Sequence, residues 1–174
     1  MSLIEVLHAT GPAAERGSQM NLYAFLVGAW DAEVLIHAPT GIVRGSAEIH
    51  ADWVLEGRAI QDVWMIPRRR DRKSDAPPLA LAGNWYGTTL RIYDVSLQAW
   101  RIHWLDPATQ RFMQQTGRAD GDDIVQLGQE PDGSLTRWRF TEIRADSFHW
   151  WGERSVNGGL TWRLGVEIIA RRND

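Results

Sequence analysis

Apolar and polar side chains alternate with a period of two from Trp30 almost to the end of the chain, and this pattern constrains the fold most. A period of two is typical of β-strands that bury one face. Turn-forming sequences such as Pro131-Asp132-Gly133 and Asn157-Gly158-Gly159 interrupt it at short intervals. Loops this short join antiparallel neighbours, because parallel strands need crossovers of about a dozen residues. No amphipathic stretch of helical length follows residue 30. The sequence therefore predicts an all-β, antiparallel fold.

The number of predicted strands favours a closed arrangement. An up-and-down β-barrel of about ten strands would use the whole stretch and would leave no exposed sheet edge. A two-sheet sandwich is the structural alternative. The predicted strands lie near residues 30–37, 42–52, 53–66, 79–85, 88–94, 98–105, 110–118, 123–128, 134–144, 147–155 and 161–171.

The residues before the barrel predict a short helical N-terminus. Ser2-Leu3-Ile4-Glu5 has the capping-box pattern, which predicts a first helix to about His8. Ser18 can cap a second, apolar segment over Met20–Val27 that ends at Gly28. Two turns of apolar helix are not stable alone in water, so we expect this segment to pack on one end of the barrel.

We accordingly expect a single β-barrel domain over residues 1–174, with a helical segment over about 1–28 and the barrel over about 29–172.

Composition excludes several classes of function. The ten tryptophans favour sheet, and the absence of cysteine excludes disulfides, thiolate nucleophiles and cysteine-ligated zinc. A net charge of −3 disfavours a nucleic-acid partner. The N-terminus lacks the basic and apolar regions of a signal peptide, and no apolar run is long enough to span a membrane. We therefore expect a cytoplasmic protein with no membrane partner.

The charge is nevertheless uneven along the chain. The run Arg68-Arg69-Arg70-Asp71-Arg72-Lys73 carries five positive groups and one negative group, and it continues into Ser74-Asp75-Ala76-Pro77-Pro78. Such a composition predicts a solvated, mobile loop between strands. The alternative is a basic flap over a barrel mouth that attracts an anionic ligand.

Several strands separate their side chains into an apolar and a polar face. Trp100, Ile102 and Trp104 share one face, and Arg101 and His103 share the other. If the apolar faces point inward, the lumen is lined by Trp100, Trp104, Trp138, Phe140, Phe148 and Trp150. Alternatively, some polar side chains point into the lumen and bind a polar group of a ligand. The candidates for this inversion are Arg91 with Tyr93 and Arg58 with Asp62. A slip of one residue in the register exchanges the faces, so the sequence leaves both assignments open.

Two short motifs carry structural predictions. Gly28-Ala29-Trp30 resembles the lipocalin signature, in which the Trp packs across the closed barrel end at the start of the first strand. Ser155-Val156-Asn157-Gly158-Gly159-Leu160-Thr161-Trp162 matches the Asp-box of sialidase-type propellers, with Asn157 where Asp is usual. The motif occurs convincingly only once, and the chain is too short for a propeller. We therefore interpret these residues as the turn of a β-hairpin.

A longer pattern resembles a known family. The order of these segments resembles an uncharacterised bacterial family of calycin-like (lipocalin-superfamily) β-barrel domains over roughly residues 20–172. The resemblance implies the barrel and implies no activity or catalytic residues. The segments are 25–30, 54–60, 87–94 and 155–162, with Trp100 and Trp104 between the last two.

The favoured function is binding of a small, largely apolar or anionic ligand in the lumen. Arg58, Arg91 and Arg139 are the predicted anchors for a carboxylate or another anion. The predicted wall consists of Trp64, Tyr93, Trp100, Trp104 and Trp150.

Two alternatives remain open. The first is a cofactor-free enzyme of isomerase, cyclase or lyase type, in which Asp62 or Glu153 lies beside His103, His149, Arg91 or Tyr93. The second is a structural role as a homodimeric barrel with tryptophan-rich strand faces at the interface. The sequence has no nucleophile elbow, phosphate-binding loop or zinc-binding helix motif. We therefore predict no metal and no cofactor.

Overall fold

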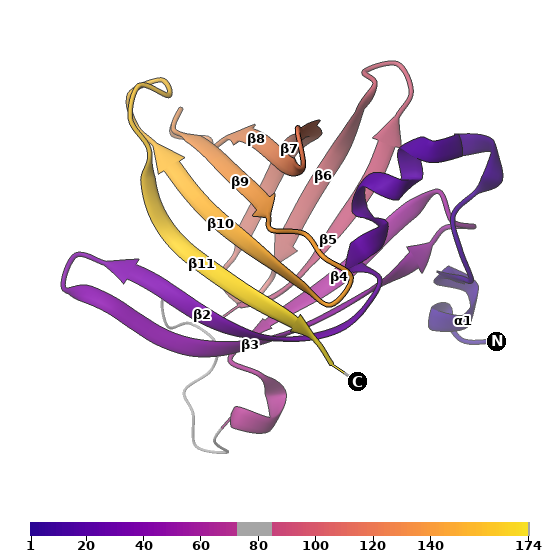
Figure 1. The fold of residues 1–174 in the computed structure, drawn as a ribbon, viewed down its shortest axis with the longest axis horizontal. Helices are drawn as coiled ribbons and strands as arrows, with labels where there is room; N and C mark the ends of the chain where they lie inside the picture. The colour runs from indigo at the N-terminus through magenta and orange to yellow at the C-terminus, as the bar shows by residue number, and fades with distance from the viewer. Residues whose placement is uncertain (73–84, 174) are drawn as a thin grey trace.

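A computed structural model describes residues 1–72 and 85–173, and it is a closed antiparallel β-barrel (Figure 1). Each of the strands β2 to β11 pairs with the next along the chain, and β11 pairs with β2 to close the ring. The short β1 adds to β3. This confirms the up-and-down barrel and excludes the sandwich. The strands are β1 His8–Ala9, β2 Gly28–Ala38, β3 Gly41–Val54, β4 Ala59–Ile66, β5 Trp85–Asp94, β6 Ala99–Asp106, β7 Arg111–Asp120, β8 Asp123–Gln129, β9 Leu135–Thr141, β10 Ser147–Ser155 and β11 Arg163–Arg172.

The apolar strand faces point into the lumen, as the simpler interpretation of the sequence expected. In β6, Trp100, Ile102 and Trp104 are buried, whereas Arg101 and Leu105 are exposed. The same holds for Trp138 and Phe140 in β9 and for Phe148 and Trp150 in β10, all of which border the core. The register that the sequence left open is thus settled by the need to bury these aromatic side chains.

Strand β5 departs from this rule. Its inward residues are Thr89 and Arg91, both about 1% exposed, while Leu90 and Ile92 lie on the outer face. Asp62 of the neighbouring β4 is also inside and 1% exposed. The lumen therefore contains one residue from each of the two polar pairs that the sequence indicated, Arg91 and Asp62, and these two bind each other.

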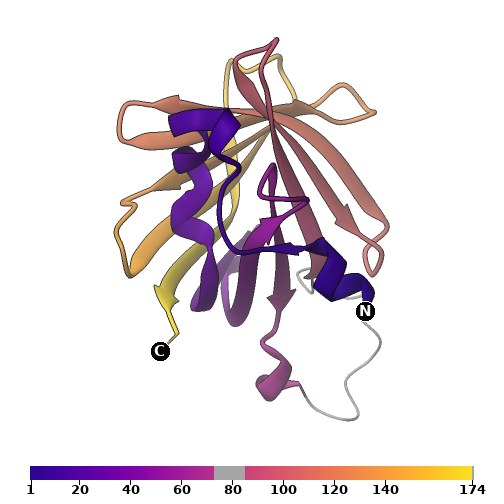
Figure 2. The same ribbon diagram turned by 90° about the vertical axis from the view of Figure 1, so that its right-hand side faces the viewer.

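The segment η1, Ala14–Leu26, covers one end of the barrel (Figures 1 and 2). It is a 3₁₀-helix rather than the α-helix predicted over Met20–Val27, and Gly17 interrupts it with a left-handed conformation. Met20, Tyr23 and Leu26 are fully buried and lie three residues apart. A 3₁₀-helix aligns residues at this spacing, so all three side chains enter the barrel end together.

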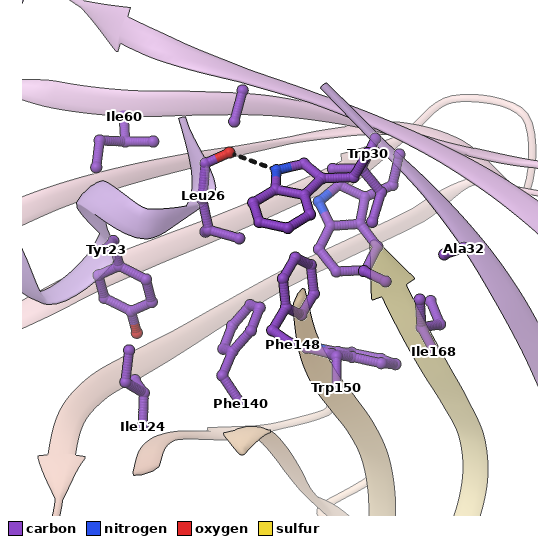
Figure 3. Packing of buried hydrophobic residues seen from close by; sticks show 14 of the residues in the cluster. Tyr23, Leu26, Trp30, Ala32, Ile60, Ile124, Phe140, Phe148, Trp150 and Ile168 are labelled. Carbon is purple, nitrogen blue, oxygen red and sulfur yellow. Dashed lines mark hydrogen bonds between the residues drawn. The ribbon is translucent and has the colours of Figure 1, made fainter. Parts of the chain in front are cut away.

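Trp30, at the start of β2, joins this segment to the barrel (Figure 3). Its indole is 1% exposed and its Nε1 donates a hydrogen bond of 2.8 Å to the Leu26 carbonyl. The guanidinium of Arg172 lies 4.1 Å from the ring centre and donates to the carbonyls of Val27 and Phe25. The structural role predicted for Gly28-Ala29-Trp30 is confirmed, and Arg172 is a partner that the sequence did not reveal.

The first helix, α1, spans Leu3–Leu7 with the expected capping box and ends at the predicted place, with His8 as its C-cap. Two predicted strand boundaries are wrong. The predicted strand 53–66 is split, because the left-handed residues Leu55, Glu56 and Gly57 form the turn between β3 and β4. The predicted start of the next strand near residue 88 is also wrong, because β5 begins at Trp85. Of the predicted strand 79–85, residues 79–84 lie outside the described part.

The described part of the basic run lies on the outer wall. Arg69–Asp71 form the short helix η2, and Arg70 pairs with Asp31 of β2 at 2.5 Å. Partial burial alone would raise the pKa of Glu48 on β3, but hydrogen bonds from Arg69 and His50 hold it at about 2. Arg68, Arg69 and Arg70 thus pair with the acidic strand residues Asp31 and Glu48 instead of covering the mouth. Lys73 and the residues to Pro78 lie outside the described part.

The Asp-box sequence forms the hairpin between β10 and β11. The Ser155 hydroxyl accepts a hydrogen bond of 2.9 Å from the backbone N–H of Gly159, and Asn157 Oδ1 accepts one of 3.0 Å from that of Thr161. Trp162 Nε1 donates to the Gly159 carbonyl at 3.1 Å. These contacts support the structural interpretation of the motif.

No helix in the described part of the chain has the length and apolar character needed to cross a membrane.

The contact between Tyr23 and Gly117 tests the packing of η1. A Cβ at Gly117 would overlap the Tyr23 hydroxyl oxygen, while the ring carbon behind it lies 3.4 Å away. We expect Gly117→Ala to lower the free energy of unfolding by about 1–3 kcal/mol. Tyr23→Phe should be nearly neutral, since that buried hydroxyl makes no hydrogen bond within the described residues. In the Tyr23→Phe background, Gly117→Ala should lower the free energy of unfolding by less than it does in wild type, as measured by urea denaturation. Additive costs would contradict the packing described here.

Candidate functional site

The barrel contains a pocket of about 300 Å³ at the end opposite η1. Strand ends and hairpins surround its opening, with Thr109 and Arg111 on one side and Arg154 and Arg163 on another. The remaining lining residues come from β2, β4 to β7 and β9 to β11. They are His37, Trp64, Trp85, Thr89, Arg91, Trp104, Asp106, Met113, Thr136, Trp138, Trp150, Gly152, Glu153, Gly165 and Val166.

Five indoles form most of the apolar wall. Trp150 contacts Trp138 with ring centres 5.4 Å apart, Trp64 at 5.6 Å and Trp85 at 5.9 Å. Trp104 contacts Trp85 at 5.9 Å and Trp138 at 6.3 Å. The contacts are edge-to-face or tilted, an arrangement that aromatic quadrupoles favour. The indoles therefore brace one another and border the pocket at the same time.

A buried ion pair lies on the inner side of this wall. Arg91 donates to Asp62, and the exposed fractions of their side chains are 1% and 0%. Asp62 Oδ1 also accepts a hydrogen bond of 3.1 Å from the Thr89 backbone N–H. The Arg91 guanidinium lies 5.3 Å from the centre of the Tyr23 ring. Burial raises the pKa of the Tyr23 hydroxyl well above its ordinary value, although the Arg91 charge opposes this shift. The pair thus separates the pocket from the packed closed end.

Arginines dominate the charge at the rim. Arg111 pairs with Glu130 at 2.8 Å, and Arg154 pairs with Asp132. Arg163 is exposed and has no acidic partner among the described residues. It lies directly opposite Arg154 in the register of β10 and β11, so two positive side chains adjoin at the mouth.

Asp106 is the buried acid of the pocket. It continues the inward series of Trp104 in β6 and is fully buried. Its Oδ1 accepts hydrogen bonds from the backbone N–H groups of Ala108 and Thr109, at 2.9 and 3.2 Å. Its Oδ2 is buried and accepts none from the described residues.

Six of the predicted site residues lie in the lumen, and two border it. Tyr93 packs edge-to-face on Trp100 with ring centres 5.8 Å apart, near the closed end. Glu153 borders the pocket but is held by two hydrogen bonds from Arg137, at 2.7 and 3.0 Å. The six lumen residues are Asp62, Trp64, Arg91, Trp100, Trp104 and Trp150. Trp100 belongs to the closed-end core, against Tyr23, and does not line the pocket.

Arg58 and Arg139 lie outside the lumen in which we expected them. Arg58 follows the left-handed turn and pairs with Glu15 at 2.8 Å. Arg139 faces outward from β9 and lies 3.3 Å from Asp120. Both charges are thus satisfied by surface acids.

The two histidines of the enzyme alternative lie away from the lumen, whereas His37 lines the pocket and pairs with Glu167 at 2.6 Å. His103 shares the outer face of β6 with Arg101. His149 pairs with Glu167 on the outer wall at 3.0 Å. No cluster of three or more potential metal ligands occurs among residues 1–72 and 85–173.

Most lining residues of the pocket were not predicted as site residues, and four of them bear on ligand binding: Trp85, Asp106, Met113 and Arg163. Trp85 ended the predicted strand 79–85, and Asp106 lay just beyond the predicted strand 98–105. The alternation of Trp100, Ile102 and Trp104, extended by one step, would have indicated that Asp106 points inward. Met113 and Arg163 had no distinguishing local signal, because only the register places them at the pocket.

Comparison with known proteins defines the fold and no more. The chain is similar to the crystal structure of Rv2717c from M. tuberculosis, with a TM-score of 0.59 and 12% identity over 91% of this chain and 99% of that one. It is also similar to the S-type phycobiliprotein lyase CPES from Guillardia theta, with a TM-score of 0.57 and 12% identity over 94% and 99%. The calycin-like barrel is therefore shown. The chain matches no protein-family model and no curated protein.

The buried pair gives a prediction about stability. Asp62→Leu leaves the Arg91 charge buried without its partner and should lower the free energy of unfolding by about 3–5 kcal/mol. Adding Arg91→Met should recover part of this loss, because two apolar side chains need no partner. Urea denaturation measures both.

The exposed pair of Arg101 with Asp94, 2.6 Å apart, is the matched control. Arg101→Met should cost less than about 1 kcal/mol. If the double variant at Asp62 and Arg91 were less stable than Asp62→Leu alone, the role assigned to the pair would be wrong.

Proposed function

We propose that the barrel binds a small, flat, largely apolar molecule in its tryptophan-lined pocket, with an anionic group of the ligand at the rim. The observation that carries this proposal is the pocket itself, with five indoles on its wall and arginines at its rim. Small-molecule sites are mostly apolar cavities in which a few polar groups fix the orientation of the ligand. Its volume of about 300 Å³ is at the lower end of the range for such sites, which favours a ligand of two or three fused rings.

The rim supports an anionic substituent. Arg111 and Arg154 are each paired with an acid, whereas Arg163 has no such partner among the described residues. A guanidinium binds a carboxylate or sulfonate through charge-assisted hydrogen bonds. Arg163 therefore takes the anchoring role that the sequence had assigned to Arg58 and Arg139.

Binding agrees with the comparisons without depending on them. One similar structure is a phycobiliprotein lyase. At 12% identity the likeness carries the fold alone to this chain. The proposal rests on the side chains of this pocket.

Only some of the side chains predicted for the enzyme alternative lie together in the structure. Asp62 does lie beside Arg91, but the two bind each other in the lumen. His103 and His149, the groups best suited to proton transfer near neutral pH, face outward. Binding is therefore the better-supported function. The homodimeric role and the cytoplasmic location stay predictions from the sequence.

Filling the pocket should abolish binding. Met113 lines the pocket, and the adjacent Phe112 is exposed on the outer face of the same strand. We expect wild type to bind 9-anthracenecarboxylate with quenching of tryptophan fluorescence. Met113→Trp should weaken binding by about tenfold or more, because it removes volume from the site. Phe112→Trp adds the same indole outside and should leave the affinity unchanged. Equal effects of the two variants, or no binding by wild type, would refute lumen binding of this ligand class.

The rim charge gives a separate prediction. Arg163→Glu should lower the affinity for 9-anthracenecarboxylate by about tenfold, since it replaces the attraction between the guanidinium and the ligand carboxylate with a repulsion. Arg171→Glu changes the same charge on the same strand at the opposite end of the barrel and should have little effect. Titrations at low and high salt measure both. If the Arg163 and Arg171 variants behaved alike, only the net charge of the protein would matter.

A further inference from the structure

The pocket holds an acceptor that nothing in the protein uses. We propose that Asp106 recognises the ligand by accepting a hydrogen bond from an N–H group on its aromatic ring system, such as a protonated ring nitrogen or an aromatic amine. This inference rests on the proposed function and specifies the polar chemistry of the ligand.

The two carboxylate oxygens of Asp106 differ in their surroundings. Oδ1 is occupied by the N–H groups of Ala108 and Thr109, which fixes the side chain at the end of β6. Oδ2 is buried and has no donor in the described part of the protein. Burying an acceptor without a partner costs free energy, and a ligand donor in the pocket would remove that cost.

The neighbours of Asp106 do not supply the missing donor. Arg111 lies opposite Asp106 in the register of β6 and β7, but its guanidinium pairs with Glu130 at 2.8 Å. Arg91 pairs with Asp62. The nearest inward residue of β6 is Trp104, whose ring packs on Trp85 and Trp138. The acceptor therefore lies beside an aromatic wall with no cation of the described residues bound to it.

This combination selects a particular ligand chemistry. The indole faces favour a flat ring and tolerate a positive charge on it, because an aromatic face attracts cations. The Asp106 carboxylate favours a donor on the edge of that ring, where the hydrogen bond is charge-assisted. A purely hydrocarbon ring would leave Oδ2 without a partner. A nitrogen heterocycle or an aromatic amine would satisfy it.

Two probes of equal ring size separate this inference from the proposed function. 9-Aminoacridine carries N–H donors and a positive charge, whereas 9-anthracenecarboxylate has three fused rings and no N–H. Both fluoresce, so their affinities follow from direct titration of the intact protein. The test variant is Asp106→Asn, since its remaining Oδ1 can still accept from Ala108 and Thr109 while an amide N–H₂ replaces Oδ2.

We expect Asp106→Asn to lower the affinity for 9-aminoacridine by about tenfold or more. The same variant should bind 9-anthracenecarboxylate as tightly as wild type or more tightly. Asp120→Asn removes the same charge from an exposed position on β7 and should change neither affinity by more than about twofold. Thermal unfolding of the Asn variants would verify that both remain folded.

The outcomes are distinct. If wild type binds 9-anthracenecarboxylate but not 9-aminoacridine, or if Asp106→Asn weakens both probes equally or neither, the role of Asp106 is refuted and the pocket still binds ligand. If wild type binds neither probe, the proposed function fails, and this inference fails with it.

Discussion

The closed end of the barrel depends on the burial of one indole, that of Trp30. An indole N–H inside a protein needs an acceptor, and here the acceptor is the Leu26 carbonyl at the end of η1. That carbonyl is free because the helix ends there, where backbone acceptors have no intrahelical partner. Arg172 stacks on the same ring from the last strand and donates to two further carbonyls of the segment. The first strand, the last strand and the N-terminal segment are thus joined at one aromatic ring.

This junction explains why the pocket lies at the other end. Trp30 fixes the position of η1. The side chains of Met20, Tyr23 and Leu26 then fill the lumen at the closed end and pack with Trp100, Phe140 and Phe148. Such packing leaves no space for a ligand, as expected for a protein interior. The buried pair of Arg91 and Asp62 lies at the limit of this core, with Tyr23 on one side and the tryptophan wall on the other. The pocket lined by the five indoles therefore lies at the opposite mouth, and a second pocket of about 900 Å³ lies beside η1 at the closed end.

Local patterns predicted the barrel well, because its determinants are local. The alternation in Trp100, Ile102 and Trp104 is sufficient to place a strand and its inward face, and the short turns are sufficient to make neighbours antiparallel. The site was harder to predict. Arg58 is an even number of residues from Asp62 and would share its face in a continuous strand. The left-handed residues Leu55 to Gly57, however, interrupt the strand, and Arg58 pairs with Glu15. Arg172 and Trp30 meet only across a long separation in sequence, and no local signal marks the contact.

The polar groups of the pocket are arranged asymmetrically, and under the proposed function this arrangement would orient a bound ligand. The inner pair is satisfied within the protein, since Arg91 and Asp62 bind each other and Thr89 completes the acid. Asp106 and Arg163, by contrast, lie at strand ends near the mouth, and in the described structure Oδ2 of one has no donor and the guanidinium of the other has no acid. A ligand that binds both must keep its polar edge toward the mouth and its apolar rings among the indoles. Because the two groups carry opposite charge, a molecule with an N–H donor and an acidic group on one edge satisfies both, whereas a molecule with only one of them leaves a polar group unpaired.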